Sequence, residues 1–350
     1  MARLLLPFKD WPVMDRRAWK TAIVEGDILD GQGPAAHWRA PTRRTNIQHY
    51  GRWLSYLKAH KELDGQSSPE DRVTPNQIQR YIKHIEPRLA PRTVVSSLVG
   101  LKVMLMALCP HKDWRWLADI CNRLNRTARP TTDKQARMLD TDVIIKAALH
   151  RMDQLQSGPM QTRLDRVAYR DLVMLAFMAA RPLRLRNFAG MIIGRHLRQT
   201  SDGWEILIPA EETKTRKELS FKAPAFLLPY LGYYLEVVRK SFLQSGQPTA
   251  ALWLGFQGRP LSDHGAYQRF VTITKKLFGH AINPHLLRDC AATTLSSLSV
   301  NDAITAAALL GHHSFTTTQK HYIRARQLEA SRKINTLINA VASQDRGDLQ

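Results

Sequence analysis

Two stretches near the C-terminus decide how this chain can fold: NPHLLRDCAATTL at residues 283–295 and LLGHHSFTTTQKHYIRA at residues 309–325. In the first, His285 and Arg288 stand three residues apart near a predicted helix start, so they share one face of that helix. In the second, a histidine follows a helix-ending glycine, and Tyr322 comes ten residues after that histidine. The pattern predicts helical segments that present basic and hydroxyl side chains.

Two further basic motifs lie upstream of these helices. In RPLRLRNFAGM, at residues 181–191, a proline opens a helical turn after a buried helix, and Arg184 leads into that turn. Lys214 lies in the polar turn between GWEILIP at 203–209 and ELSFKAP at 218–224. The first segment is rich in β-branched and aromatic residues, and the second returns after the polar turn, which together predict a β-hairpin.

Each of these residues also has an ordinary structural explanation when it is taken alone. A single arginine in so basic a chain is most often a surface charge, and a lysine on a hairpin tip is usually only solvated. Tyr322 alone would be a core or interface tyrosine. His312, His313 and His321 lie close together, but no Cys or acidic residue stands beside them at zinc-ligand spacing. The sequence therefore predicts no metal site.

The composition limits the class of protein and the kind of partner. The chain has 350 residues, with 51 Lys plus Arg against 30 Asp plus Glu and a formal charge of +21. Nucleic acid is the default partner for such a field, and an anionic membrane surface is the lesser alternative. The apolar share of 44% excludes a disordered or collagen-like chain.

Cysteine usage and the N-terminal sequence bear on the compartment. Cys109, Cys121 and Cys290 are scattered and form neither a disulfide framework nor a zinc motif, so a reducing interior is expected. The opening MARLLLPFKDWP lacks the apolar core and the cleavage site of a signal peptide. No run approaches the roughly 18 uncharged apolar residues of a membrane span. We therefore expect a cytoplasmic protein, associated with the nucleoid through DNA and not with a membrane.

Helical periodicity and charge divide the chain into five parts. Thr74 is predicted to cap a helix that begins at Pro75. A second helix carries a buried apolar stripe at Val94, Leu98, Leu101, Leu105 and Leu108. The parts are an N-terminal extension of unclear role with one short helix (1–40), a helical domain (41–126), a basic linker (127–138), a second domain (139–325) and a C-terminal helix or tail (326–350).

Taken together and in this order, the motifs resemble those of the tyrosine recombinase family, the phage-integrase class of site-specific DNA recombinases. That family combines an Arg after a helix end, a Lys in a hairpin turn, H-x-x-R on a later helix, L-G-H before Ser and Thr residues, and a later Tyr. This chain supplies Arg184, Lys214, His285 with Arg288, Leu310-Gly311-His312, and Tyr322. The segments TPNQIQRYI and APRTVVSSLVGLKVML also look like the family's core-binding domain, so the resemblance spans roughly residues 42–335.

The resemblance implies both a fold and a reaction. The fold is mainly α with a small β-hairpin or sheet: an N-terminal helical core-binding domain precedes an α+β catalytic domain. Tyr322 would be the nucleophile that forms a 3′-phosphotyrosyl link to DNA. Arg184 and Arg288 would clamp the phosphate in the transition state, because guanidinium groups bind phosphate as planar forks.

The remaining implied roles concern protons and charge. His285 and His312 would add hydrogen bonds, and Lys214 would protonate the departing 5′ oxygen. No metal or other cofactor is expected, because the arginines supply the positive charge that divalent ions supply in nucleases. The chain departs from the family at two positions, with Asn187 where a Glu is common and Asp289 where a His is common.

The implied partners are duplex DNA with inverted-repeat core sites, a homotetramer assembled on two DNA sites, and a possible directionality factor. Integration or excision of a mobile element is favoured over chromosome-dimer resolution. A type IB topoisomerase-like enzyme and a catalytically silent DNA-binding protein remain alternatives. Six basic residues of the first domain and the linker are candidates for DNA contacts: Arg43, Arg44, Arg92, Lys102, Arg129 and Lys134.

The last residues carry an apolar stripe on an otherwise polar predicted helix. Two placements are open, because the stripe could pack on its own catalytic domain or dock on a neighbouring protomer of a ring. The stripe consists of Ala330, Ile334, Leu337, Ile338 and Val341.

Overall fold

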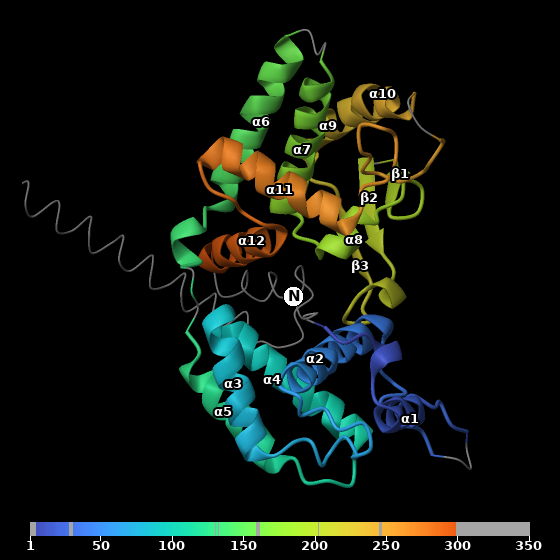
Figure 1. Ribbon diagram of the computed structural model, residues 1–350. Coiled ribbons are helices and arrows are strands. Elements are labelled where there is room, and N and C mark those ends of the chain that lie inside the picture. The colour runs from blue at the N-terminus through green and yellow to red at the C-terminus, as the bar shows by residue number, and fades with distance from the viewer. Residues whose placement is uncertain are drawn as a thin grey trace, which may run out of the picture. The chain divides into compact units, whose positions relative to one another are not determined.

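The computed structural model describes residues 5–27, 31–129, 131, 133–158, 162–201, 203–244 and 247–298, with side chains up to residue 294. The chain divides into two compact units, residues 1–133 (unit 1) and residues 134–350 (unit 2), whose elements are labelled in Figure 1. Each unit has a hydrophobic core of its own.

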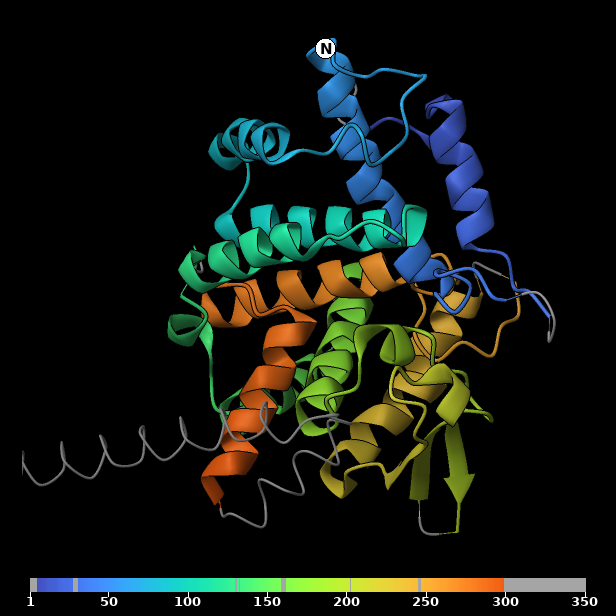
Figure 2. The same cartoon turned by 90° about the horizontal axis from the view of Figure 1, so that it is seen from below.

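Unit 1 is a group of helices without a strand among its described residues. Figure 2 shows α4 and α5 side by side, and α4 also packs against α1 and α2. The helices are α1 (Val13–Ala22), α2 (Ala40–Ala59), α3 (Pro75–Ile85), α4 (Pro91–Leu108) and α5 (Arg115–Thr127), with 3-10 turns at Phe8–Asp10 and Glu86–Arg88.

The start of α3 and the buried face of α4 follow the sequence prediction. The Thr74 hydroxyl accepts a hydrogen bond from the Gln77 N–H, the Gln77 side chain accepts one from the Thr74 N–H, and Pro75 is the first helical residue. The predicted stripe of α4 is buried along its whole length. This helix is long and apolar enough to cross a membrane by length and composition alone, but 56% of it is buried inside the unit. It has the character of a core helix.

The N-terminal extension is part of unit 1. On α1, the Asp15 carboxylate is fully buried, accepts a hydrogen bond from the Tyr50 hydroxyl at 2.6 Å and forms an ion pair with Arg72. Arg72 also donates to the carbonyl oxygens of Asp64 at 2.6 Å and Ser67 at 2.8 Å. The extension is thereby fastened to the helical bundle through a buried and well-paired charge.

Unit 2 combines seven α-helices with one small sheet in its described residues. The strands β1 (Leu197–Thr200), β2 (Gly203–Ile208) and β3 (Leu219–Lys222) pair antiparallel in the order β1-β2-β3. The helices are α6 (Thr141–Ser157), α7 (Arg163–Ala180), α8 (Leu185–Ala189), α9 (Leu228–Tyr233), α10 (Lys240–Leu243), α11 (Asp263–Phe278) and α12 (Pro284–Leu298). A π-helical segment, Tyr234–Arg239, joins α9 to α10. The predicted fold class, mainly α with a small sheet, is confirmed.

The core of unit 2 is built around α7. Every residue from 169 to 179 is buried, and α6, α11 and α12 all pack against this helix (Figure 1). A helix that is enclosed on all sides needs apolar residues around its circumference, which the run LVMLAFMAA supplies. Pro182 follows two residues after the last helical residue, Ala180, and a proline cannot continue a helix. The chain therefore turns sharply at residues 181–184.

Candidate active site

The short helix α8 is held in place by an aromatic cluster. Phe188 is fully buried, and its ring stacks on Trp253 with centroids 4.8 Å apart. Phe177 of α7 and Phe270 of α11 pack against the same ring at 5.6 Å and 5.5 Å. Because Arg184 is the N-cap residue of α8, this anchor also fixes the backbone from which its side chain projects.

Arg184 and Arg288 are brought together from two separate elements. Arg288 lies in the second turn of α12, and its Nη1–H donates a hydrogen bond to the carbonyl oxygen of Pro182. Pro182 belongs to the turn at residues 181–184 that ends in Arg184. The Arg184 charge is near enough to lower the pKa of Arg288. Two of the six residues predicted to be catalytic therefore share one place in the fold.

Both guanidinium groups are unfavourable to bury in the free protein. Burial, and then the charge of Arg184, lowers the pKa of Arg288 to about 10, and the neighbouring Asp289 carboxylate opposes this shift only in part. Burial also lowers the pKa of Arg184. An anion placed beside the pair would favour the charged form of both groups. The pair has the electrostatic character of an anion site.

The start of α12 positions Arg288 and His285. The Asn283 side chain accepts a hydrogen bond from the Leu286 N–H at 2.9 Å, and Pro284 is the first helical residue. His285 is exposed, whereas Arg288 is half-buried one turn later. The predicted helix start is confirmed, and His285 lies on the exposed surface of the helix that carries Arg288.

Lys214 lies in the connection between β2 and β3, residues 209–218, which we call the lysine loop. Its side chain is exposed, between the buried side chains of Thr213 and Thr215. The Thr213 hydroxyl donates to the Lys217 carbonyl oxygen at 2.9 Å and accepts from the Lys217 N–H at 3.1 Å. These bonds close the loop around Lys214.

Glu212 joins the lysine loop to the rest of unit 2. Its carboxylate pairs with Arg195 and accepts a hydrogen bond from His196 Nε2 at 3.0 Å. His196 Nδ1 accepts from the Ile192 N–H at 3.0 Å, which assigns the ring proton to Nε2. The Asn187 amide of α8 donates to the Glu212 carbonyl oxygen at 3.5 Å. The loop is therefore connected to the helix that Arg184 caps.

The two departures from the family pattern both have partners. Asn187 contacts Glu212 as described, so an amide stands where the family commonly has an acid. Asp289 pairs with Lys134, with 2.5 Å between Oδ2 and Nζ, and its side chain is 17% exposed. Asp289 thus fastens the segment before α6 to α12 and sits next to Arg288.

The structure describes all six basic residues predicted to contact DNA, and their DNA contacts stay a prediction. Arg43 donates to the Ala36 carbonyl oxygen at 2.7 Å, and Arg92 donates to the Asn125 side chain at 2.6 Å. Lys134 pairs with Asp289. The other three are Arg44 and Arg129, which are exposed, and Lys102, which is half-buried.

The remaining predicted residues lie outside the described residues. These are His312, Tyr322 and the C-terminal stripe of Ala330, Ile334, Leu337, Ile338 and Val341. Their roles stay predictions from the sequence.

Sequence reasoning missed three side chains around this site: Arg181, Glu212 and His196. Arg181 is the first residue of the motif that carries Arg184, so a positional signal was present. Glu212 stands two residues before Lys214, but acidic residues in turns are common. No local pattern marks His196, because its importance arises only from the contact with Glu212.

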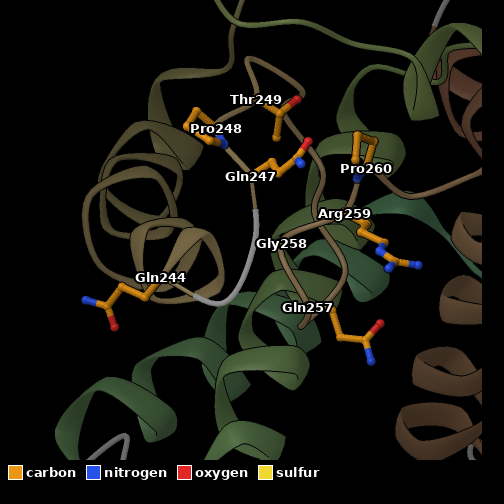
Figure 3. A pocket seen from close by; sticks show the side chains of 8 residues that line it. All are labelled: Gln244, Gln247, Pro248, Thr249, Gln257, Gly258, Arg259 and Pro260. Atoms are coloured by element: carbon orange, nitrogen blue, oxygen red, sulfur yellow. The ribbon is translucent and has the colours of Figure 1, made fainter.

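A surface hollow of about 940 Å³ lies elsewhere in unit 2. Figure 3 shows side chains from two loops and the end of α10 around it. None of its lining residues is one of the predicted catalytic residues, and most of the lining is exposed and polar. The lining consists of Gln244, Gln247, Pro248, Thr249, Gln257, Gly258, Arg259 and Pro260.

The site lies in a part of the chain that matches a known family. Residues 150–329 match the sequence profile of the phage integrase family. That segment is more than half of the chain, and the chain belongs to this family.

Curated relatives and solved structures agree with this assignment. The chain is 35% identical over 91 residues to tyrosine recombinase XerC of Lactobacillus leichmannii, and the match covers 26% of this chain and 30% of that relative. The fold resembles the XerH site-specific recombinase bound to difH substrate, with a TM-score of 0.55 and 16% identity over 83% of this chain and 78% of that chain. It also resembles the Tn1549 transposon integrase in complex with transposon right end DNA, with a TM-score of 0.51 and 15% identity. That match covers 85% of this chain and 96% of the transposon integrase chain.

Proposed function

We propose that this chain is a site-specific DNA recombinase that cleaves and rejoins DNA strands through a covalent link between Tyr322 and a 3′-phosphate. The observation that carries the proposal is the pair Arg184 and Arg288, two half-buried guanidinium groups held together in a chain of the phage integrase family. A phosphodiester needs positive charge on its nonbridging oxygens as a nucleophile attacks. Two planar forks meet that need.

The proposed cleavage is a displacement at the phosphorus of the scissile phosphate. The Tyr322 phenol oxygen bonds to phosphorus as the bond from phosphorus to the 5′ oxygen breaks, and the phenol proton passes to a neighbouring base, for which His285 is our candidate. Lys214 donates a proton to the leaving 5′ oxygen. The phosphotyrosine keeps the energy of the broken ester, so a 5′ hydroxyl of another strand can reverse the step without ATP.

The proposed substrate is duplex DNA with inverted-repeat core sites. The net charge of +21 supports a partner of that kind. We infer a tetramer on two such sites, and integration or excision of a mobile element as the biological role. A protein that works on DNA in this way would lie in the cytoplasm, at the nucleoid.

The proposed assembly uses the C-terminal stripe that begins at Ala330, which would dock on the neighbouring protomer. Truncation after Arg326 is then expected to leave single-site DNA binding intact and to abolish joining of two sites. A truncated chain that instead unfolds at a markedly lower temperature as a monomer would place the stripe in its own core.

Covalent trapping tests the proposed reaction. The protein is incubated with a library of labelled inverted repeats, and the covalently attached DNA is sequenced. Wild type should give an adduct at a defined site, and Tyr322→Phe should give none while keeping nearly the same DNA affinity, since one hydroxyl supplies few of the phosphate contacts. An adduct formed by the variant would place the nucleophile elsewhere, and the exposed Tyr267 of α11 would be examined first.

The same assay in EDTA tests the source of the positive charge. Cleavage should continue, because the proposed stabilising groups are all side chains. Loss of the adduct on chelation, with recovery on adding Mg²⁺, would contradict the arginine mechanism.

A further inference from the structure

A third arginine, Arg181, lies in the turn at residues 181–184, and few hydrogen-bond acceptors in the described residues offset the burial of its guanidinium. Its side chain is half-buried, and burial lowers the pKa of the guanidinium. The Nε–H is buried and has no hydrogen-bond partner in the described part of the chain. Within the described ranges the guanidinium donates one hydrogen bond, from Nη1 to the carbonyl oxygen of Ala180, at 3.0 Å. Five N–H donors are available on the group, so most have no protein acceptor among the described residues.

Two other buried arginines of this chain have several acceptors that offset the burial of their charge. Arg170 is 2% exposed, and its Nε and Nη2 donate to the Asp171 carboxylate at 3.0 Å and 2.6 Å. Arg239 has no carboxylate partner in the described residues, but it donates to the carbonyl oxygens of Thr249 and Ala251 at 2.6–3.0 Å. A cation held away from water normally needs acceptors of this kind. Within the described residues, Arg181 has one backbone acceptor and no carboxylate, which leaves its guanidinium available to an acceptor outside the chain.

The position of Arg181 indicates which acceptor this is. The next residue, Pro182, accepts the hydrogen bond from Arg288, and Arg184 follows two residues later. On its other side, the Arg181 guanidinium lies 5.6 Å from the ring centroid of Phe221 on β3, the strand that leaves the lysine loop. A cation over an aromatic ring is weakly attracted to it. Arg181 therefore belongs to the turn that meets Arg288, and its guanidinium lies near the strand that follows the lysine loop.

We propose that Arg181 binds the DNA phosphate adjacent to the scissile phosphate, so that three arginines of one site hold two consecutive phosphates. This inference rests on the proposed function, since it takes the Arg184 and Arg288 pair as the scissile-phosphate site. Adjacent phosphates of the same strand are the anions nearest to that site. Through its contact with Phe221, Arg181 also connects the bound DNA strand to β3, the strand that follows the lysine loop.

The test replaces single phosphates of the trapped DNA site by neutral methylphosphonates and measures affinity in the Tyr322→Phe background. For the parent protein, neutralising the flanking phosphate should weaken binding by about 10-fold or more, as expected for a charge-assisted hydrogen bond. Arg181→Met should bind unmodified DNA about as weakly, and it should lose almost nothing further on the modified DNA. Arg186→Met, which removes an exposed arginine of α8, should keep the full methylphosphonate effect.

Two results would overturn the inference. One is an undiminished methylphosphonate effect in Arg181→Met. The other is a variant whose thermal stability falls while its DNA binding is unchanged, because that result would assign the guanidinium a partner within the protein. If Arg181→Met does not fold, Arg181→Lys keeps the charge without the fork, and it should show a clearly reduced methylphosphonate effect; an undiminished one again overturns the inference.

The proposed function is judged separately, by the covalent adduct of wild type on unmodified DNA. A chain that forms no adduct on any DNA contradicts the proposed function. An adduct together with an unaltered methylphosphonate effect in Arg181→Met contradicts only the role of Arg181.

Discussion

Arg72 in unit 1 and Arg288 in unit 2 are both largely withdrawn from water, but their surroundings differ. Burial alone would lower the pKa of Arg72, but the Asp15 carboxylate and Tyr50 reverse this, and its pKa lies above the ordinary value. For Arg288, burial and the charge of Arg184 act in the same direction and lower the pKa to about 10. Asp289 offsets this only in part.

We propose that the difference separates a structural arginine from one that binds a ligand. Arg72 meets a carboxylate and backbone carbonyl oxygens inside its own unit, so its charge is satisfied in the free protein. Unit 2 contains the same structural type in Arg170, which is paired with Asp171. The contrast therefore belongs to the two places in the fold and not to the two units. It predicts that stability depends on the first type and function on the second.

The largest expected effect is on stability, for Arg72→Met. The substitution leaves the fully buried Asp15 carboxylate without its ion-pair partner, and breaking a buried pair in this way costs about 3–5 kcal/mol of unfolding free energy. Urea denaturation followed by tryptophan fluorescence measures it, since unit 1 holds Trp11, Trp19, Trp38, Trp53, Trp114 and Trp116. Loss of less than about 1 kcal/mol would show that Asp15 is not dependent on Arg72.

Arg288→Met is expected to slow cleavage and to leave stability unaffected, in contrast to Arg72→Met, whose expected effect is on stability. Removing one transition-state donor should slow DNA cleavage by about 10²–10³-fold. Stability should not fall, because the folded protein holds this proton less tightly than the unfolded chain does. The charged guanidinium therefore lowers the unfolding free energy at neutral pH. The unfolding free energy of the wild-type protein rises only as pH increases from about 10 toward the unfolded pKa. Urea denaturation of both proteins at pH 7.5, with single-turnover cleavage, gives the comparison. A destabilised variant with normal cleavage would make Arg288 structural, like Arg72.

Glu212→Gln tests whether the lysine loop depends on the contacts of the Glu212 carboxylate with Arg195 and His196, the two residues before β1. The substitution weakens the ion pair with Arg195, which is partly exposed, so cleavage should slow by about 5-fold. The slowing should vanish on DNA with a 5′-thiol leaving group, since a thiolate leaves without a proton from Lys214. Lys214→Ala is the reference variant and should show a larger slowing with the same dependence on the leaving group. Equal slowing of both substrates by Glu212→Gln would assign its effect to something other than Lys214.

The smallest expected effect is for an exposed arginine, Arg44→Gln. Its guanidinium is solvated in the free protein, so the substitution should leave stability within about 0.5 kcal/mol. If Arg44 contacts a DNA phosphate, the slope of log affinity against log salt should decrease by about 0.9. Titrations at several salt concentrations measure the slope, and an unchanged slope would remove Arg44 from the DNA-contacting set.

How far the sequence predicts this structure depends on the range of the interactions. Local rules predicted the α3 cap at Thr74, the buried stripe of α4 and the strand pair β2 and β3. They missed β1, because LRQT is short and only its first residue is buried. They also missed α5, whose only fully buried side chains are Leu117 and Cys121, and the helical stretch from α9 to α10.

The candidate site shows the same limit. The motifs identified Arg184 and Arg288 individually, and family resemblance placed them together. Nothing in the sequence indicated that Arg288 would donate a hydrogen bond to the Pro182 carbonyl oxygen. Nothing indicated either that the Glu212 carboxylate would accept a hydrogen bond from His196. Those contacts join residues 106 and 16 positions apart, and they depend on how the folded unit brings α12 to the turn at residues 181–184 and the lysine loop to the residue before β1.

The most direct test of the central claim is the pKa of the Arg288 guanidinium, measured by NMR titration of arginine-labelled Tyr322→Phe protein with and without the trapped DNA site. Arg288→Lys assigns the resonance. The free protein should titrate near pH 10, and bound DNA should raise the pKa by at least about one unit, because the phosphate charge favours the protonated guanidinium. An ordinary pKa of about 12.5 in the free protein, or a pKa near 10 that DNA leaves unchanged, would contradict the account.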